Sequence, residues 1–587
     1  MLERRRWQVR LADHASLRPY LAEGVTVAVI TAATAGAYVW TKAPLYNPRG
    51  TIDPWLYTAL WTNFGQVYHQ FVHTYYAARV PWIVPGYVAN LIFSPRTASL
   101  VVHTVFFFVG AAAVYVLCRR FVSWQSAAAS YAMVVGSQVY FSAQRWDYEE
   151  GAVLTYAALA AVFVTTRASS SRAQDAGIAL AGFFSAALVA TQLLDAVLLL
   201  GLPLLYAAAQ GKWRRVPVRR DIAAFAVGAL VLIVACGIFA RANGGRFLFF
   251  MPQVKVALTQ SGEANQMSPD VWIPREPYFF VPPFLVVAAA VTWLVAAPSL
   301  TRRTRNFLIA STAWTALLYT LLCLWEFFGT GFFFEYVWYF SAFMLLFACV
   351  VAAISEAIAA RVASSVAAVA IPLAVAVAAL VPLLWVYKND GLGRIAAGTT
   401  NTAYRDFTIA MIVALVLMAV SRIAAARAAS LAALAAVVLA VSYGLDASLG
   451  TWYDGVSDPA TGSLYDIGMQ EIAFLRSHGF DEALPHFWYD RTAQPQGVLG
   501  SIQSLYYYSY TYVGVSMPLI DSDFRSRVKI FGNPASIVLL CTTPSCAGGP
   551  AALRKAGHPV RLASSTVLRS GSLRVWAFVY DGFAKGA

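Results

Sequence analysis

The first residue that could take part in catalysis is Asp53, an acid that follows the first long hydrophobic segment of the chain. It lies in segment 47–57, which reads NPRGTIDPWLY. A carboxylate just outside a membrane can take a proton from an attacking hydroxyl or amine, so Asp53 is a candidate general base. Trp55 and Tyr57, in the same segment, are candidates for the wall of a cleft or for contacts to an acceptor.

A second acidic turn, segment 142–150, reads SAQRWDYEE and adjoins an apolar run. Ionisable residues so close to hydrocarbon are costly unless they are paired or hydrated, so they predict a functional site. The predicted catalytic residues here are Asp147, Glu149 and Glu150, and Arg145 is predicted to line the cleft. The alternative is a hydrated turn closed by its own arginine–aspartate pair. If the turn faces Asp53, different surroundings would separate the pKa values of these carboxyl groups.

The composition identifies the kind of protein that must position these acids. Hydrophobic residues make up 59% of the 587 residues and charged residues only 12%, with a mean hydropathy of +0.60. Such a chain is too apolar for a soluble protein, so we predict an α-helical polytopic membrane protein. Apolar runs of about 18 residues or more give about 13 spans. They are expected near 21–40, 98–117, 125–141, 150–166, 176–192, 194–209, 222–240, 281–298, 307–325, 338–358, 365–386, 407–421 and 428–445.

The distribution of Lys and Arg predicts the orientation of these spans. Basic residues concentrate in alternate connections, which are cytoplasmic by the positive-inside rule. They lie at 4–6, 119–120, 167–172, 212–220, 302–305, 361 and 422–427. The amino terminus is therefore predicted to be cytoplasmic, and the net charge of +14 is a topology signal rather than a sign of nucleic-acid binding. No cleavable signal peptide is seen, so the first span is expected to be retained.

An odd number of spans places the carboxyl-terminal region outside. We expect residues 1–445 to form the transmembrane module, with outer loops at 41–97, 142–150, 241–280 and 387–406. Residues 446–587 are predicted to form a small α/β domain. Its strand-like segments are 535–541, 560–563 and 573–580, and its helix candidates are 469–477 and 551–557.

Two cysteines of the predicted outer domain, Cys541 and Cys546, are separated by four residues. In an oxidising compartment they would close a short disulfide loop, and otherwise they are two thiols. Zinc is disfavoured because no second cysteine pair lies near them.

The long outer loops are expected to shape a cleft. Loop 41–97 is rich in aromatic residues, which suits short helices at the headgroup level; the alternative is a belt of aromatic side chains that only anchors the protein. Loop 241–280 contains Gly244 and Gly245, which suit a hinge. A further acidic and aromatic segment, 325–335, ends in Glu335, a second candidate for the cleft.

Together these features resemble the GT-C superfamily of glycosyltransferases that use polyprenyl-phosphate sugars. The resemblance rests on the acidic first outer loop, the acidic turn 142–150, the segment RVPWIVP at 79–85, the number of spans and the outer carboxyl-terminal domain. The most similar groups in plan are protein O-mannosyltransferases, bacterial aminoarabinose transferases that modify lipid A, and catalytic subunits of oligosaccharyltransferases. The resemblance covers the whole chain in architecture but only about residues 45–90 and 142–151 in motif.

The chain departs from these families in two places. Many O-mannosyltransferases carry Asp-Glu in the first loop, whereas Asp53 is followed here by Pro54. The Trp-Trp-Asp motif of oligosaccharyltransferases is missing, and the nearest string, FWYD at 487–490, is too loose to replace it. The second departure argues against asparagine-linked transfer and leaves the acceptor open among an envelope lipid, a polysaccharide and a protein.

The resemblance implies a reaction. The donor would be a polyprenyl-phosphate-linked sugar whose lipid tail lies between spans, in the inner membrane of a bacterium, with its phosphate at the periplasmic face. Asp53 would activate the acceptor for a single inverting displacement, and cations would bind the leaving phosphate. Arg79 and Lys255 are the predicted phosphate-binding residues. No cofactor is implied with certainty, although a divalent cation bridging Asp53 and Asp147 is compatible with the chemistry.

Two other functions remain open. A lipid or polysaccharide transporter or flippase would also use many spans, but transporters usually place ionisable groups at the bilayer midplane, and the acids here gather at the outer ends of spans. A non-catalytic scaffold for envelope assembly would tolerate replacement of Asp53.

Overall fold

The computed structural model describes most of the helical region and four strands near the carboxyl terminus. The described residues are 21–37, 52–62, 64–144, 148–168, 170–210, 219–259, 273, 277–328, 334, 341, 343–362, 370–380, 400–424, 427–452, 470–471, 473–474, 477–478, 486–489, 536–541, 561–570 and 573–581.

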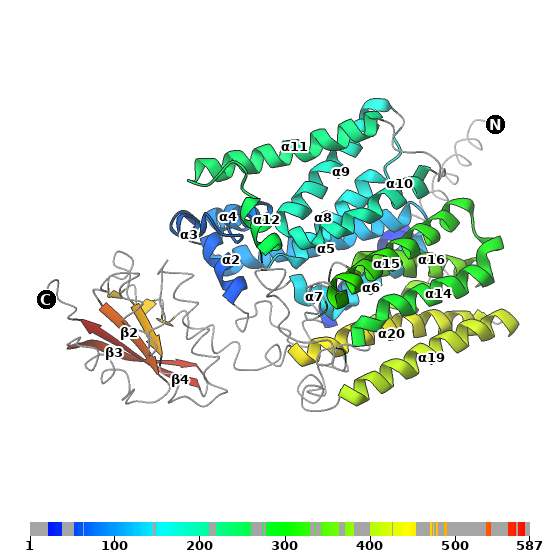
Figure 1. The fold of residues 1–587 in the computed structure, drawn as a ribbon. Coiled ribbons are helices and arrows are strands. Elements are labelled where there is room, and N and C mark those ends of the chain that lie inside the picture. Colours follow the sequence, from blue (N-terminus) through cyan, green and yellow to red (C-terminus); the bar gives the residue numbers. More distant parts are fainter. Residues whose placement is uncertain are drawn as a thin grey trace, which may run out of the picture.

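The chain is predominantly helical (Figure 1). After an apolar helix at Leu21–Ala37, the first half contains α2 (Ile52–Thr62), α3 (Phe64–Phe71), α4 (Val80–Ile92), α5 (Pro95–Arg119), α6 (Trp124–Gly136), α7 (Gln138–Gln144), α8 (Glu150–Val164), α9 (Ser171–Thr191), the 3-10 helix η1 (Leu193–Gly201), α10 (Leu202–Gln210), α11 (Arg219–Ala242) and α12 (Met251–Thr259). The second half contains η3 (Pro277–Phe280), α14 (Val281–Ala296), η4 (Ala297–Ser299), α15 (Arg302–Phe328), α16 (Met344–Val362), an apolar helix at Ala370–Leu380, α19 (Thr400–Ala424) and α20 (Arg427–Trp452).

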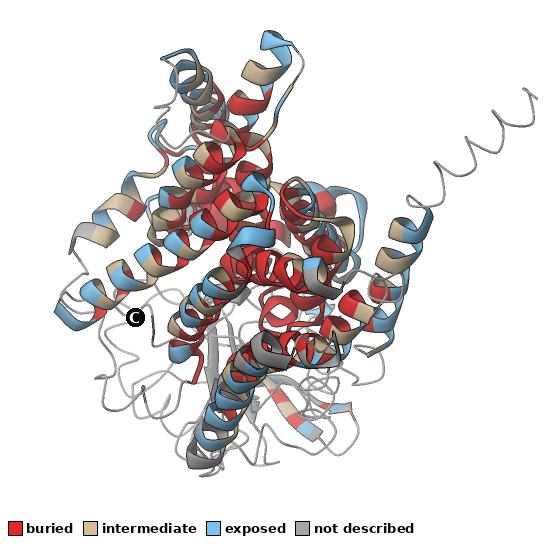
Figure 2. Cartoon of the chain, turned by 90° about the vertical axis from the view of Figure 1, so that its right-hand side faces the viewer, coloured by how far each residue is buried: buried red, intermediate tan, exposed pale blue. Residues whose placement is uncertain are grey.

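The apolar runs of the sequence are helices. Six helices of the described part are long and apolar enough to cross a membrane, and each of the predicted spans overlaps a described helix. Large apolar side chains cover their outer faces, as in Leu294, which is 73% exposed, and Phe328, which is 85% exposed. Figure 2 shows buried residues in the interior of the helix assembly and exposed ones along its outer helices. This distribution suits a helical bundle surrounded by lipid tails.

Small residues allow α9 and α11 to pack closely. A Cβ atom on Gly228 would stand 1.7 Å from the carbonyl oxygen of Ala179, and one on Gly182 would stand 1.9 Å from that of Phe225. Both obstacles are backbone atoms, which cannot rotate away. Close approach at small residues is a typical source of helix association within membranes.

The aromatic outer loop forms short helices, as predicted, but its aromatic side chains are mostly packed inside. Tyr57, Trp61, Phe64 and Tyr68 are each at most 6% exposed. Trp61 and Trp82 meet edge to face with their ring centroids 4.8 Å apart, which joins α2 to α4. For these side chains, the alternative of an outward-facing belt is therefore wrong, and α2 to α4 form a packed layer.

A four-stranded sheet lies near the carboxyl terminus in the order β1-β2-β4-β3. Its strands are β1 (His486–Tyr489), β2 (Ser536–Cys541), β3 (Arg561–Ser570) and β4 (Leu573–Asp581). β1 and β2 are parallel and the other pairs are antiparallel. Three strands occur where the sequence predicted them, and β3 extends seven residues further than the predicted segment. The FWY part of the string at 487–490 belongs to β1, while the predicted helix at 551–557 and Cys546 lie outside the described residues.

The close contact between α9 and α11 leads to a first prediction. Gly228→Ala inserts a methyl group against backbone, so we expect the free energy of unfolding to fall by about 1–3 kcal/mol. The measurement is thermal unfolding of the purified protein in detergent. Gly36→Ala is the matched control, because a Cβ there meets nothing within 4 Å and Ala favours a helix. Equal stability of the two variants would contradict the close approach.

Candidate functional site

The site is built around Arg79, which stands at the N-cap of α4. Pro81 occupies the first turn of this helix, where a missing N–H group is harmless and the fixed φ angle favours helix initiation. The helix therefore begins directly after Arg79. Its guanidinium points into the protein rather than to its surface, since the residue is only 5% exposed.

Three neighbours bind this guanidinium. It forms an ion pair with Glu149, donates a hydrogen bond to the hydroxyl of Tyr57, and donates another from Nη2 to Oε1 of Gln192 at 3.1 Å. The amide of Gln192 also donates to Oε1 of Glu149 at 3.4 Å. The four residues come from α2, the start of α4, the start of α8 and the end of α9, so this buried cluster joins four separate segments.

Aromatic rings enclose the same cation. The guanidinium carbon of Arg79 lies 5.2 Å from the ring centroid of Tyr75, 5.5 Å from that of Tyr57 and 5.8 Å from that of Tyr148. A cation close to several aromatic rings is attracted by the quadrupoles of those rings, and the attraction is stronger where water is excluded. Burial lowers the pKa of Arg79, but Glu149 and the tyrosines raise it by more, so its pKa lies well above its usual range. The guanidinium is a permanent cation in this site.

The acidic turn is buried. Glu149 is 0% exposed and Glu150 is 3% exposed, and they form the N-cap and the first residue of α8. The N-terminus of a helix favours negative charge, which offsets part of the cost of burial. For these two acids the alternative of a hydrated turn is wrong. Arg145 and Asp147, which that alternative would pair with each other, lie outside the described residues.

The sequence patterns did not identify two members of the site, Gln192 and Asp195, which lie where the predicted spans 176–192 and 194–209 meet. Gln192 adopts an extended conformation that ends α9, and η1 begins at the next residue. Both side chains are at most 5% exposed. Irregular backbone at membrane depth is tolerated only where it is buried in protein or lines a cavity. Two polar residues within an otherwise apolar run were the available signal.

Acids outnumber the described cations around Arg79. Glu149, Glu150 and Asp195 lie within electrostatic reach of one another and of Arg79. In the described part of the chain, neither carboxyl oxygen of Glu150 has a hydrogen-bond partner, and Oδ1 of Asp195 has none. Burying such groups without partners costs free energy, so their presence here indicates a functional site.

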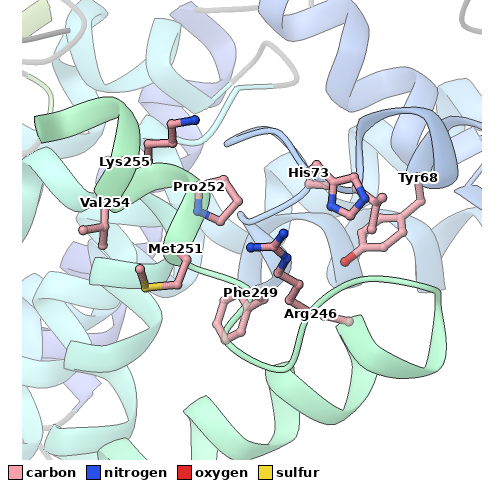
Figure 3. A pocket seen from close by; sticks show the side chains of 11 residues that line it. Tyr68, His73, Arg246, Phe249, Met251, Pro252, Val254 and Lys255 are labelled. Carbon is pink, nitrogen blue, oxygen red and sulfur yellow. The ribbon is translucent and has the colours of Figure 1, made fainter. Parts of the chain in front are cut away.

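A pocket of about 520 Å³ opens near this cluster. Its walls come from α3, the residues that follow it, the end of α11 and α12 (Figure 3). Figure 3 shows the guanidinium of Arg246 between His73 and Pro252, with Lys255 beyond Pro252. The lining residues are Tyr68, Val72, His73, Ala77, Ala240, Arg246, Phe249, Met251, Pro252, Val254 and Lys255.

The pocket is joined to the cluster by packing. Phe249 and Ala240, which line it, share a hydrophobic cluster with Val80, the neighbour of Arg79. Gln253 of α12 also donates a hydrogen bond to the carbonyl of Ala190, 2.9 Å away and just before the break in the helix. Gly244 has a positive φ of 84°, which ends α11 and turns the chain back toward the pocket.

The remaining predicted site residues divide into two groups. Tyr57 is fully buried against Arg79, and Lys255 is exposed at the pocket. Asp53 and Trp55 belong to the first turn of α2, but their side chains lie outside the described part, as do Asp147, Arg145 and Glu335. Among the described residues, no group of three or more His, Cys, Asp or Glu side chains is arranged to hold a metal ion.

Comparison with known proteins identifies the fold. The chain is similar to the crystal structure of ArnT from Cupriavidus metallidurans bound to undecaprenyl phosphate, with a TM-score of 0.50 and 14% identity over 94% of this chain and 97% of that one. The apo structure of the same protein matches with a TM-score of 0.48 and 15% identity over 95% and 98%. No protein-family model and no curated protein matches the sequence. The likeness to the first structure confirms the predicted GT-C-like helical membrane fold.

The buried ion pair leads to a second prediction. Arg79→Gln or Glu149→Gln alone leaves an uncompensated buried charge, so each should destabilise the protein by about 3–5 kcal/mol. The double variant removes both charges, and we expect it to lose clearly less than the sum of the single losses. The measurement is a double-mutant cycle of unfolding in detergent.

The matched control is the exposed pair of Arg220 and Asp175. Water screens both of these groups, so the cycle of Arg220→Gln and Asp175→Asn should show little coupling. Additive losses at Arg79 and Glu149 would contradict a direct interaction between them.

Proposed function

We propose that this protein transfers a sugar from a polyprenyl-phosphate donor to an envelope lipid, polysaccharide or protein, at the periplasmic face of a bacterial inner membrane. The observation that carries this proposal is the buried cluster of Arg79, Tyr57, Glu149 and Gln192, which holds α2 and α8 together beside a pocket with two cations. The protein whose fold this chain shares was solved with undecaprenyl phosphate, which supports a lipid donor of this kind.

Asp53 is the proposed general base. It stands four residues before Tyr57 on α2, so the two positions share one face of that helix. Tyr57 is bound by Arg79, which holds α2 beside the cluster. A base must be held within about 3 Å of the proton that it takes, which requires such a rigid support.

The proposed reaction is one inverting displacement. Asp53 takes the proton of an acceptor hydroxyl or amine, and the freed electron pair forms a bond to the anomeric carbon. The bond from that carbon to the phosphate oxygen breaks on the opposite side, and its electron pair leaves with the polyprenyl phosphate. The acceptor gains the sugar with inverted configuration, and the proton remains on Asp53 until solvent removes it.

The leaving phosphate requires cations, and the pocket supplies them. Lys255 and Arg246 line it together with His73, and both cations reach the surface where a lipid phosphate would arrive. Arg79 is proposed as a third contact, because its Nε–H has no acceptor among the described residues after its other N–H groups bind Glu149, Tyr57 and Gln192. Arginine and lysine stabilise phosphate oxygens through charge-assisted hydrogen bonds.

Two further assignments belong to the proposal. Glu149 and Glu150 would keep the acceptor side of the site polar, with Asp147 and Arg145 at the same turn. We also place the sheet, within the domain 446–587, on the periplasmic side, because an odd number of predicted spans lies between it and the basic amino terminus.

One observation favours the alternative of a transporter or flippase. The apolar run that contains Gln192 and Asp195 is broken by irregular backbone, and transporters use broken helices with polar residues as binding sites. A transporter would move a lipid-linked sugar without consuming it. The fate of that donor therefore separates the two functions.

The third prediction concerns Asp53. Without a general base, transfer should fall by about 10²–10⁴-fold in Asp53→Asn, while the amount and stability of the protein stay unchanged. The measurement is mass spectrometry of glycolipids, polysaccharides and polyprenyl-phosphate sugars from cells that lack the protein and carry the wild type or the variant. We expect the donor to accumulate and one sugar to be missing from a product unless the wild type is present.

The control for this experiment is Asp175→Asn, which removes a partly exposed acid near the start of α9, at the other end of that helix from Gln192. It should restore the product fully. Full restoration by Asp53→Asn as well would remove the proposed base and favour the transporter or scaffold functions.

The fourth prediction concerns the pocket. Lys255→Gln and Arg246→Gln each remove a charged partner of the phosphate, so the Kd for undecaprenyl phosphate should rise by about tenfold to a hundredfold. Native mass spectrometry of the purified protein with this lipid measures the change. Arg241→Gln removes an exposed charge near the end of α11 that does not line the pocket, and it should bind as the wild type does. Equal binding by all variants would exclude this phosphate site.

A further inference from the structure

Three arginines from different connections converge at the end of the bundle opposite to the candidate site. Arg120 follows α5, Arg167 follows α8, and Arg303 lies in the first turn of α15. Arg303 is within electrostatic reach of both Arg120 and Arg167. α8 starts at the buried acids and ends near Arg167, so about 21 Å of helix separates the two places.

The protein holds Arg120 in place. Its Nη1 donates hydrogen bonds to the carbonyl of Val162 and, at 2.9 Å, to Oγ1 of Thr165. Both acceptors belong to the C-terminal end of α8, where the last carbonyl groups lack backbone N–H partners within the helix. Arg120 therefore ties the end of α5 to the end of α8, and its charge is fixed at that junction.

Arg303 is fixed on the same junction. Its guanidinium carbon lies 5.5 Å from the ring centroid of Phe121, which in turn stacks on Phe307 with centroids 4.4 Å apart and an interplanar angle of 5°. Thr304 donates from Oγ1 to the carbonyl of Phe121 at 2.9 Å. These contacts bind the start of α15 to the connection between α5 and α6, so Arg303 is drawn toward Arg120.

No described acid neutralises this group. Among the described residues, Arg120, Arg167 and Arg303 form no ion pair. Arg119, which precedes Arg120 in the chain, pairs with Glu23. The carboxylate of Glu356, on α16, accepts hydrogen bonds from Ser123 instead. Burial is the main cause that lowers the pKa of Arg120, and the charge of the neighbouring Arg303 lowers it further. The fold thus brings like charges together without a counter-ion from the described chain.

We propose that Arg120, Arg167 and Arg303 bind the phosphate group of an anionic phospholipid at the cytoplasmic surface of the membrane. The positive-inside rule requires basic residues on this side, but it does not require three helix connections to aim them at one place. A basic site between transmembrane helices at the cytoplasmic surface has the chemistry that recognises an anionic headgroup. The exposed apolar faces of the helices provide the surface along which the acyl chains of such a lipid lie.

Lipid binding tests this proposal directly. The purified full-length protein is mixed with phosphatidylglycerol or with phosphatidylcholine, and bound lipids are counted by native mass spectrometry. We expect the wild type to bind phosphatidylglycerol preferentially. Each of Arg303→Gln and Arg167→Gln should weaken that binding about fivefold, and the double variant about 25-fold. Arg120 is left unchanged because its hydrogen bonds also support the fold.

Arg219→Gln is the matched control, because it removes an equal, exposed charge from the start of α11, in a connection predicted to be cytoplasmic. It should bind the lipid as the wild type does. A loss as large as that in Arg303→Gln would show a diffuse effect of charge and overturn the site, as would a wild type without preference between the two lipids. Inorganic phosphate serves as a competitor: displacement of the lipid at millimolar concentration would identify a soluble phosphate as the source of the ligand, and no displacement would identify the lipid.

Discussion

The structure depends above all on one buried ion pair, between Arg79 and Glu149. Removing two charges from water costs several kcal/mol for each ion, and the loss is recovered only where geometry is good and the remaining donors are satisfied. Tyr57 and Gln192 supply those further hydrogen bonds, and aromatic rings exclude water around the cation. Because the four residues come from segments that are distant in the chain, the cluster is complete only where α2, α4, α8 and α9 meet.

The helix packing below this layer makes such burial possible. Trp61 against Trp82 joins α2 to α4, and glycines let α9 and α11 approach until their backbones touch. These contacts place the break at Gln192 beside Arg79, where an amide can bridge a cation and a carboxylate. Interrupting a helix in an apolar run is unfavourable by itself, because backbone groups lose their partners. One of these groups, the carbonyl of Ala190, accepts a hydrogen bond from Gln253 of α12.

Charge is divided between the two ends of the bundle. At one end, acids exceed described cations around Arg79, beside a pocket that contains Lys255 and Arg246. At the other end, three arginines gather without a described acid. In the proposed function these two ends have separate tasks: the first handles the phosphate and the acceptor of the reaction, and the second fixes the protein to the headgroups of the opposite leaflet. Helices such as α8 connect them rigidly.

The sequence by itself determined the class of the protein, the positions of its spans and most strands of its sheet, because hydropathy and strand alternation are local properties that tertiary contacts rarely reverse. It also pointed to Glu149, Glu150 and Arg79 as site residues, since charge beside an apolar run is visible without a structure. Only the tertiary structure decided that Arg79 pairs with Glu149, that the aromatic residues of the first outer loop face inward, and that Gln192 and Asp195 join the site. Those outcomes depend on which helix ends meet in space, and that is fixed by the packing of distant segments rather than by any local pattern.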